Sequence, residues 1–438
     1  MLLIVKRLKL YEMVICIAGK NEIAVNALKF ILNNKPENYT VVGLPNTHDD
    51  GVNGWQPSFK FACISLKVPL VTLEECYKEK DLIFLSLEFA QLIKPKNFLT
   101  TKLFNFHFSL LPAYKGSLTS IYPILNGDTH SGVTLHRIDV GIDTGKIIAQ
   151  NILSIDPTHN SRNLYDSYNK YALDLLKMNF SSLLSNTFTE KVQPVVGSSF
   201  YSAKSISFTD ININLYKTAF EINNQVRAFA FREYQLPSIK EQSVYRSELI
   251  YMRAIGKPGT IIIQNEDWFL INAIDYQVKI FKDREVALFE AATKGDINEV
   301  KRIGDAGFDI NIKNKKGWNI LLVACYNQQM PLVLYLISKG FEANSTNYKG
   351  TTALMFAKSA ATRTGNIELL QWMLENGADV SLRDDLGKSA LDYARINDAQ
   401  AVIELLESFE KGSTATQGLE NNRWPSPHGS LGAIEMQL

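Results

Sequence analysis

The sequence has 438 residues, 46% hydrophobic and 21% charged, which is typical of a soluble globular protein with two or three domains. Its 46 basic and 45 acidic residues leave a formal charge of +1, so it lacks the basic surplus that nucleic-acid-binding domains usually carry. Four scattered cysteines, without metal-ligand spacing, indicate a reducing, cytoplasmic compartment and no metal site. No run approaches the roughly 20 apolar residues that a membrane span needs.

The chain opens with the pattern of a doubly wound, Rossmann-like α/β sheet. A buried strand at 13–18 is followed by a glycine turn and a helix at 23–32. Further strands are predicted at 39–44, 68–71, 82–87 and 103–108, and a helix at 161–184 closes a first domain of residues 1–192. No GxGxxG motif follows the first strand, which argues against a nicotinamide cofactor. Because the strand pattern begins at Met13, we expect residues 1–12 to be an extension.

Two segments of this domain contain residues suited to catalysis. Asn105 and His107 are two positions apart in one strand, so their side chains project from the same face. The turn-rich stretch 139–145 follows a later strand and can bring Asp143 over the same end of the sheet. An amide, an imidazole and a carboxylate are suited to acyl transfer, although an isolated Asn-x-His is more often a structural coincidence.

A long loop between the second and third strands is a candidate ligand-binding surface, since open sheets bind ligands beyond the carboxyl ends of their strands. It combines aromatic rings, polar donors and a cation at Trp55, Gln56, Ser58, Phe59 and Lys60. These residues are candidates for substrate binding. The alternative interpretation is that the two aromatic rings only fix the loop to the domain.

Residues 193–283 predict a small α+β module with a hairpin. Short β-rich runs, the strongest at 260–264, alternate there with a helical stretch at 216–231. The module is too small to bury much apolar surface alone, which favours a contact with another subunit.

From residue 284 the chain is repetitive. Turns at Gly307, Gly340 and Gly377 recur after 33 and then 37 residues, and two helical stretches lie within each unit. This period and turn resemble ankyrin repeats, so we expect an all-α array over 284–410. Residues 411–438 are polar and rich in Gly, Pro and Ser, and predict a disordered tail.

The catalytic segments resemble the formyltransferases that use 10-formyltetrahydrofolate. The shared order is Asn-x-His-x-Ser-Leu-Leu-Pro-x-Tyr-x-Gly from Asn105, then Gly-Val-Thr-Leu-His, then Asp-x-Gly-x-Asp-x-Gly. The resemblance implies that Asn105 stabilises the oxyanion and that His107 or Asp143, with the choice left open, is the base. It also implies folate contacts at Ser86, Leu87, Glu88, Asp139, Val140 and Asp143.

The resemblance leaves the formyl acceptor open. Methionyl-tRNA formyltransferases share the catalytic residues but carry a basic C-terminal domain, which this sequence lacks. The loop sequence Gly-Trp-Gln-Pro-Ser-Phe and the ankyrin repeats resemble nucleotide-sugar N-formyltransferases of surface polysaccharide (lipopolysaccharide O-antigen) biosynthesis, which implies a dTDP-amino-dideoxyhexose substrate and a homodimer formed through 193–283. The first candidate is dTDP-3-amino-3,6-dideoxyglucose, with an amine at carbon 4 left open. The alternative from another class is a folate-fold scaffold whose repeats bind a protein partner.

The turn residues of the repeats suggest a second small-molecule site. In an ankyrin array the residue after each turn glycine faces a groove and not the stack. Trp318 and Lys388 occupy such positions and Tyr348 is near the turn between them. Aromatic rings stack on nucleobases and a lysine suits a phosphate, so these residues predict a second dTDP or dTDP-sugar site. The alternative is that Trp318 packs against the preceding domain or binds a protein.

Overall fold

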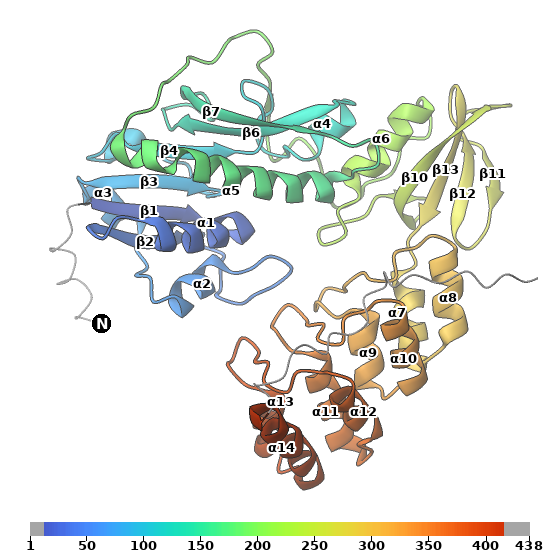
Figure 1. Cartoon of the computed structure of the whole chain (residues 1–438). Helices are drawn as coiled ribbons and strands as arrows, with labels where there is room; N and C mark the ends of the chain where they lie inside the picture. Colours follow the sequence, from blue (N-terminus) through green and yellow to red (C-terminus); the bar gives the residue numbers. More distant parts are fainter. Residues whose placement is uncertain (1–12, 416–438) are drawn as a thin grey trace, which may run out of the picture. The chain divides into compact units, whose positions relative to one another are not determined.

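The computed structural model describes residues 13–415, with side chains to residue 410. The predicted extension at residues 1–12 and residues 416–438 of the predicted tail lie outside the described residues. The chain divides into two compact units between Asp283 and Arg284. The first unit contains all the strands of the described residues, and the second is built of helices (Figure 1).

The first unit is built on a mixed six-stranded sheet of order β2-β1-β3-β4-β6-β7. Its strands are β1 (Met13–Gly19), β2 (Tyr39–Pro45), β3 (Leu82–Leu87), β4 (Leu103–His107), β6 (His130–Arg137) and β7 (Ile147–Ser154). The first four are parallel, whereas β6 and β7 are antiparallel to their neighbours. The predicted strand at 68–71 is wrong: this segment forms only an isolated bridge between Gly43 and Leu70, since Pro69 has no N–H to extend the ladder.

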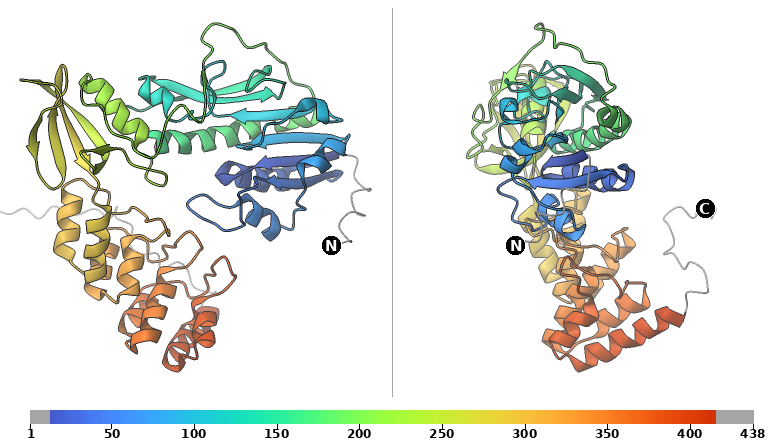
Figure 2. Two further views of the ribbon diagram at one scale, coloured as in Figure 1. Left: turned by 180° about the vertical axis from the view of Figure 1, so that it is seen from behind. Right: turned by 90° about the vertical axis from the view of Figure 1, so that its left-hand side faces the viewer.

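Both faces of this sheet are buried, which explains why its parallel strands are continuously apolar. Ile15 and Ile17 of β1 face the main core, beneath α1 (Asn21–Asn34) and α5 (Ser161–Ser185). Cys16, between them, faces a second core on the other side. Figure 2 shows α1 and α5 along one face of the sheet. Three short helices, α2 (Phe59–Ser65), α3 (Leu73–Lys78) and α4 (Tyr122–Leu125), and the 3-10 turn η2 (Pro95–Asn97) lie in the connections.

The remainder of the first unit is the small α+β module. Its antiparallel sheet has the order β11-β12-β13-β10-β9 and packs against α6 (Ala219–Phe229). The strands are β9 (Ser238–Ile239), β10 (Gln242–Arg253), β11 (Ile261–Gln264), β12 (Trp268–Asn272) and β13 (Tyr276–Lys282). A two-stranded pair, β5 (Lys115–Gly116) with β8 (Phe200–Tyr201), joins the segment after α5 to the loop that follows β4.

The second unit is a stack of helix pairs, and the predicted α/β fold followed by an all-α repeat array is confirmed. The pairs are α7 (Glu285–Lys294) with α8 (Ile297–Asp305), α9 (Ile320–Tyr326) with α10 (Met330–Ser338), α11 (Ala353–Thr364) with α12 (Glu368–Glu375), and α13 (Ala390–Ile396) with α14 (Gln400–Ala415). The longer interval of 37 residues coincides with the longer helix α11. Among residues 13–415, no helix is long and apolar enough to cross a membrane.

Candidate active site

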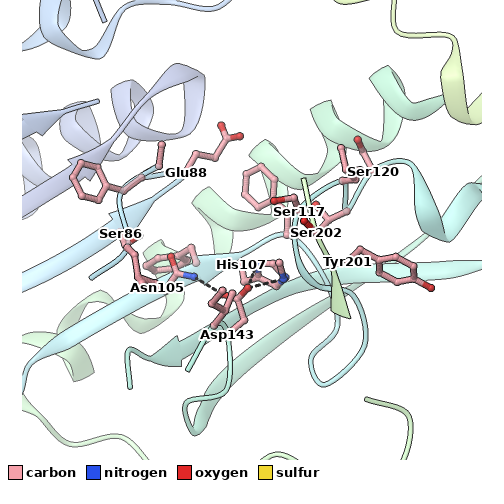
Figure 3. Close-up of a pocket in the computed structure, with 18 of the residues that line it drawn as sticks. Ser86, Glu88, Asn105, His107, Ser117, Ser120, Asp143, Tyr201 and Ser202 are labelled. Carbon is pink, nitrogen blue, oxygen red and sulfur yellow. Dashed lines mark hydrogen bonds and ion pairs between the residues drawn. The ribbon is translucent and has the colours of Figure 1, made fainter. Parts of the chain in front are cut away.

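A cavity of about 980 Å³ opens beside the carboxyl ends of β3 and β4. Figure 3 shows Asn105, His107 and Asp143 together, between Ser86 at the end of β3 and Tyr201 on β8. The turn after β3, the loop around β5 and the loop between β6 and β7 contribute the walls. The structure thus brings together the three residues predicted to be catalytic.

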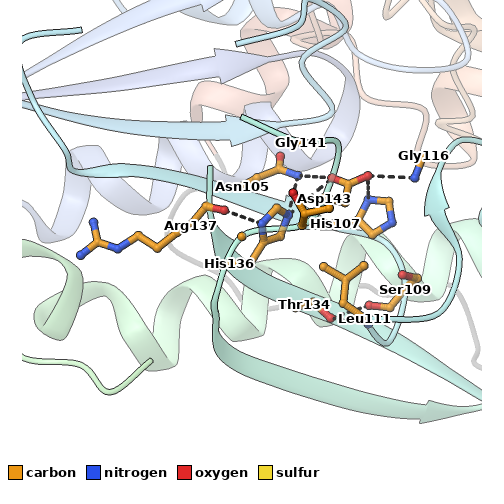
Figure 4. A network of polar contacts seen from close by, with 12 residues as sticks. Asn105, His107, Ser109, Leu111, Gly116, Thr134, His136, Arg137, Gly141 and Asp143 are labelled. Atoms are coloured by element: carbon orange, nitrogen blue, oxygen red, sulfur yellow. Dashed lines mark hydrogen bonds and ion pairs between the residues drawn. The ribbon is translucent and has the colours of Figure 1, made fainter. Parts of the chain in front are cut away.

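Asn105 lies opposite His136, because β4 and β6 pair in antiparallel register. Its Nδ2 lies 3.1 Å from Nε2 of His136 and 3.3 Å from Oδ1 of Asp143 (Figure 4). Nδ1 of His136 donates to the carbonyl oxygen of Arg137 at 2.7 Å, so its Nε2 has the lone pair that accepts from Asn105. The amide group of Asn105 is therefore already engaged by two acceptors within the site.

The imidazole of His107 is oriented by the backbone of the next loop. Its Nε2 lies 2.8 Å from the carbonyl oxygen of Tyr114, which can only accept, so Nε2 is the protonated nitrogen. Nδ1 then faces Oδ2 of Asp143 at 3.5 Å. Burial lowers the pKa of His107, although the charge of Asp143 partly offsets this effect. The neutral ring therefore presents a proton-accepting Nδ1 to the site.

Asp143 is held from several sides. Its backbone is left-handed (φ 53°), and Gln193 donates through Nε2 to the carbonyl oxygens of Asp143 and Gly145, at 2.8 Å each. Its Oδ2 accepts from the backbone N–H of Gly116 at 2.9 Å. Burial alone raises the pKa of Asp143, but His107, the second histidine of the site and this N–H outweigh it and hold the pKa at about 2. Asp143 is therefore a carboxylate at neutral pH.

The residues predicted to contact the folate lie in different environments. Ser86, Glu88, Asp139 and Asp143 line the cavity. Leu87 is fully buried in the main core and Val140 is 92% exposed, and neither side chain lines the cavity. Oδ1 of Asp139 accepts from the N–H of Gly141 and the hydroxyl of Thr144, so this carboxylate also shapes the loop that presents Asp143.

The predicted substrate loop is bound into the domain, and none of its five candidate residues lines this cavity. Phe59 is fully buried in the main core. Ser58 caps α2 and donates to Asp49, whose other carboxylate oxygen accepts from the N–H of Lys60. Gln56 accepts from the N–H of Glu22 at the start of α1.

Trp55 is half-buried and packs against other aromatic side chains. Its ring lies 6.0, 5.5 and 5.3 Å from those of Tyr165, Phe231 and Tyr234, and the guanidinium of Arg162 lies 4.9 Å from it. These three aromatic residues line the cavity, so Trp55 supports the cavity wall from behind.

Sequence reasoning did not identify His136 as part of the site, although strand alternation gave part of the signal. The alternation along β6 places Thr134 and His136 on one face, as it does Asn105 and His107 on β4. The missing information was the pairing of the two strands. Within residues 13–415 no group of three or more His, Cys, Asp and Glu side chains is placed to hold a metal ion.

In the second unit the three predicted nucleotide-binding side chains are half-buried at or near the turns. The ring of Trp318 packs against Phe356 at 4.4 Å and Tyr326 at 5.7 Å. Tyr348 lies against Gly317, and Nζ of Lys388 lies 5.5 Å from the ring of Tyr393.

Known proteins match both units. Residues 79–177 match the formyl transferase family and residues 288–384 match three copies of the ankyrin repeat. A methionyl-tRNA formyltransferase of Staphylococcus aureus (strain MW2) is 28% identical over 211 residues, 47% of this chain and 67% of that protein. The sugar 3N-formyl transferase WlaRD, solved in the presence of dTDP and 5-N-formyl-THF, is 44% identical, with a TM-score of 0.58 over 62% of this chain and 98% of that one.

A second solved structure is similar to the same extent. The N-formyltransferase from Helicobacter canadensis, in complex with folinic acid and dTDP-3-aminofucose, is 43% identical, with a TM-score of 0.57 over 62% of this chain and 100% of that one. The fold and the site therefore define the class of this protein as an N-formyltransferase with C-terminal ankyrin repeats. Within that class, the chain belongs to the sugar N-formyltransferases.

Proposed function

We propose that the protein transfers the formyl group of 10-formyltetrahydrofolate to the amine of a dTDP-amino-dideoxyhexose. The observation that carries this proposal is the cluster of Asn105, His107 and Asp143 inside a cavity of about 980 Å³, a volume that suits two ligands meeting at the cluster. The two similar solved structures contain a folate together with dTDP or a dTDP-amino sugar, which supports both ligand classes.

The geometry suits attack of an amine on a formyl carbon. The new C–N bond forms as the carbonyl oxygen becomes an oxyanion, and the bond to N10 of the folate then breaks with return of a proton to that nitrogen. Nδ1 of His107 accepts the proton of the attacking amine, and Asp143 stabilises the imidazolium that results. For Asn105 to donate to the oxyanion, one of its contacts with His136 and Asp143 must be exchanged for the substrate oxygen.

The substrate position is proposed from the similar enzymes. WlaRD is a sugar 3N-formyl transferase and the second enzyme was solved with dTDP-3-aminofucose, which favours an amine at carbon 3. We therefore keep dTDP-3-amino-3,6-dideoxyglucose as the first candidate, a sugar of the kind used in surface polysaccharides. A tRNA acceptor is disfavoured by the formal charge of +1 and by the ankyrin array.

The test is incubation of the protein and 10-formyltetrahydrofolate with a panel of 3-amino and 4-amino dTDP-dideoxyhexoses, followed by mass spectrometry. We expect the mass of a formyl adduct with a 3-amino sugar and none with the parent dTDP-sugar that lacks the amine. Asp143→Asn, which is close in shape to the native residue, is the control that shows whether product formation depends on this site. Formylation of methionyl-tRNA without any sugar product would contradict the proposal.

A further inference from the structure

Glu88 occupies an unusual position at the edge of the cavity. It directly follows β3 and has a left-handed backbone (φ 57°), which a non-glycine residue adopts at an energetic cost. Asn46 braces this turn: its Nδ2 donates to the carbonyl oxygen of Glu88 at 3.1 Å and its Oδ1 accepts from the N–H of Ala90 at 3.0 Å. A buried side chain thus maintains a strained backbone that directs a carboxyl group toward the cavity.

The carboxyl group has one oxygen held and the other available. Oε2 accepts from the hydroxyl of Tyr165 at 2.7 Å and from Nδ2 of Asn21 at 3.1 Å. Among the side chains that the structure describes, none bonds to Oε1, and Glu88 lines the cavity. Burial raises the pKa of Glu88, although Lys20, Tyr165 and Asn21 each favour the ionised form. A carboxyl oxygen in this environment is stabilised most by a ligand that donates a hydrogen bond to it.

The residues that line the cavity offer two kinds of chemistry. Apolar side chains, among them Phe89, Leu92, Ile93, Ile138 and Ile142, suit the flat pterin ring of a folate. The hydroxyl groups of Ser117, Thr119, Ser120 and Ser202 suit the polar groups of a sugar nucleotide. Figure 3 shows the Glu88 side chain extending away from Asn105 and Asp143, in the direction of Ser117 and Ser120.

We propose that Glu88 is an acceptor-specificity residue whose Oε1 receives a hydrogen bond from a ring hydroxyl of the amino sugar. This inference rests on the proposed function. The inference assigns different ligands to the two parts of Glu88. The carboxyl group contacts the sugar, whereas the backbone belongs to the strand end expected to contact the folate. The turn after β3 would then contact both substrates, the folate through backbone groups and the sugar through the carboxyl group.

The test compares Michaelis constants in the full-length protein. Glu88→Gln keeps an oxygen for Tyr165 and Asn21 but presents an amide to the sugar, so KM for the amino sugar should rise about 10- to 100-fold. KM for 10-formyltetrahydrofolate should stay within about twofold. Glu88→Asp, which shortens the side chain, should also raise KM for the amino sugar. Glu74→Gln, an exposed carboxyl on α3, is the matched control.

Acceptors lacking one ring hydroxyl at a time then identify the contact. For the analogue without the contacted hydroxyl, Glu88→Gln and the parent protein should have nearly equal KM values, while the other analogues should retain the full difference. A rise in KM for the folate alone, an equal rise in both constants, or no change in either would overturn the inference. If the parent protein formylates no amino sugar, the proposed function fails first and this inference with it.

Discussion

Nδ1 of His107 lies 3.5 Å from Oδ2 of Asp143, while Nε2 of the same ring bonds to the carbonyl oxygen of Tyr114. This arrangement leaves the nitrogen nearest the carboxylate without a proton in the neutral ring. The ring can therefore take a proton at Nδ1 and become part of an ion pair with a carboxylate whose pKa is about 2. The geometry favours His107 as the proton acceptor and Asp143 as the group that stabilises the protonated ring.

The first prediction concerns the pKa of His107. Because burial lowers it, an NMR titration should give a value below about 6.5, with the neutral ring in the Nε2–H form. Asp143 raises this pKa, so Asp143→Asn should lower it further. A depressed pKa means that stability from the buried neutral ring is present above about pH 6.5 and is lost as the pH falls through the folded-state pKa. A value above 6.5, or an upward shift in Asp143→Asn, would contradict this picture.

The second prediction concerns turnover. Separate replacement of Asn105, His107 and Asp143 by Ala should lower kcat by at least about 100-fold with the melting temperature little changed. His130→Ala, an exposed histidine at the start of β6, should leave kcat within about twofold. A His107→Ala protein with kcat within about threefold of the parent would remove the imidazole from the mechanism.

The third prediction concerns Gly116, whose N–H binds Asp143 and whose backbone is left-handed (φ 87°). A Cβ at this position would lie 2.4 Å from the carbonyl oxygen of Tyr201 and would push β8 away from β5. Gly116→Ala should therefore lower both kcat, by about 10-fold or more, and the melting temperature. Gly197→Ala has a similar φ of 78° but open space around the new methyl group, so it should cost only the backbone strain, roughly 1 kcal/mol or somewhat more. Equal effects in the two variants would refute the steric explanation.

The fourth prediction is that the protein is a homodimer formed through the small α+β module. Tyr251, Met252 and Ile255, at the end of β10 and just after it, are 87%, 60% and 81% exposed, and β11 is an edge strand with unpaired backbone groups. Sedimentation of the full chain should give a dimer, and Tyr251→Lys with Ile255→Lys should give a monomer. Met178→Lys, equally apolar and exposed but on α5, should leave the dimer intact. A dimer that survives the double change would place the contact elsewhere.

The fifth prediction is the second nucleotide site in the repeats, at Trp318, Tyr348 and Lys388. Calorimetry with dTDP should detect two sites per chain, and Trp318→Ala should leave one, since the indole would stack on the base. Trp372→Ala, on the second helix of its repeat, is the matched control and should retain both sites. A single site in the parent protein would end the hypothesis and leave Trp318 as a packing residue for Phe356 and Tyr326.

The type and order of the elements could be predicted from the sequence because they depend on local periodicity. The helix predicted at 23–32 lies within α1, and the strand at 82–87 has the bounds of β3. Asn105 and His107 share a face because alternate side chains of any strand do so. The strand predicted at 68–71 is wrong because its apolar pattern outweighed a local signal, the lack of an N–H at Pro69, which restricts pairing to one bridge.

What only the tertiary structure decided is which side chains meet. His136 joins the site through the antiparallel register of β4 and β6, and strand register is a long-range property that no local pattern contains. Trp55 was a reasonable ligand-binding candidate as a loop tryptophan, but in the structure its ring packs behind aromatic residues of the cavity wall that are more than 100 residues away in the chain. The carboxyl group of Glu88 faces the cavity because three residues from distant parts of the chain hold it: Asn46 fixes its turn, and Asn21 and Tyr165 fix one of its oxygens. Side-chain direction in a loop is set by such packing partners, and only folding brings them into contact.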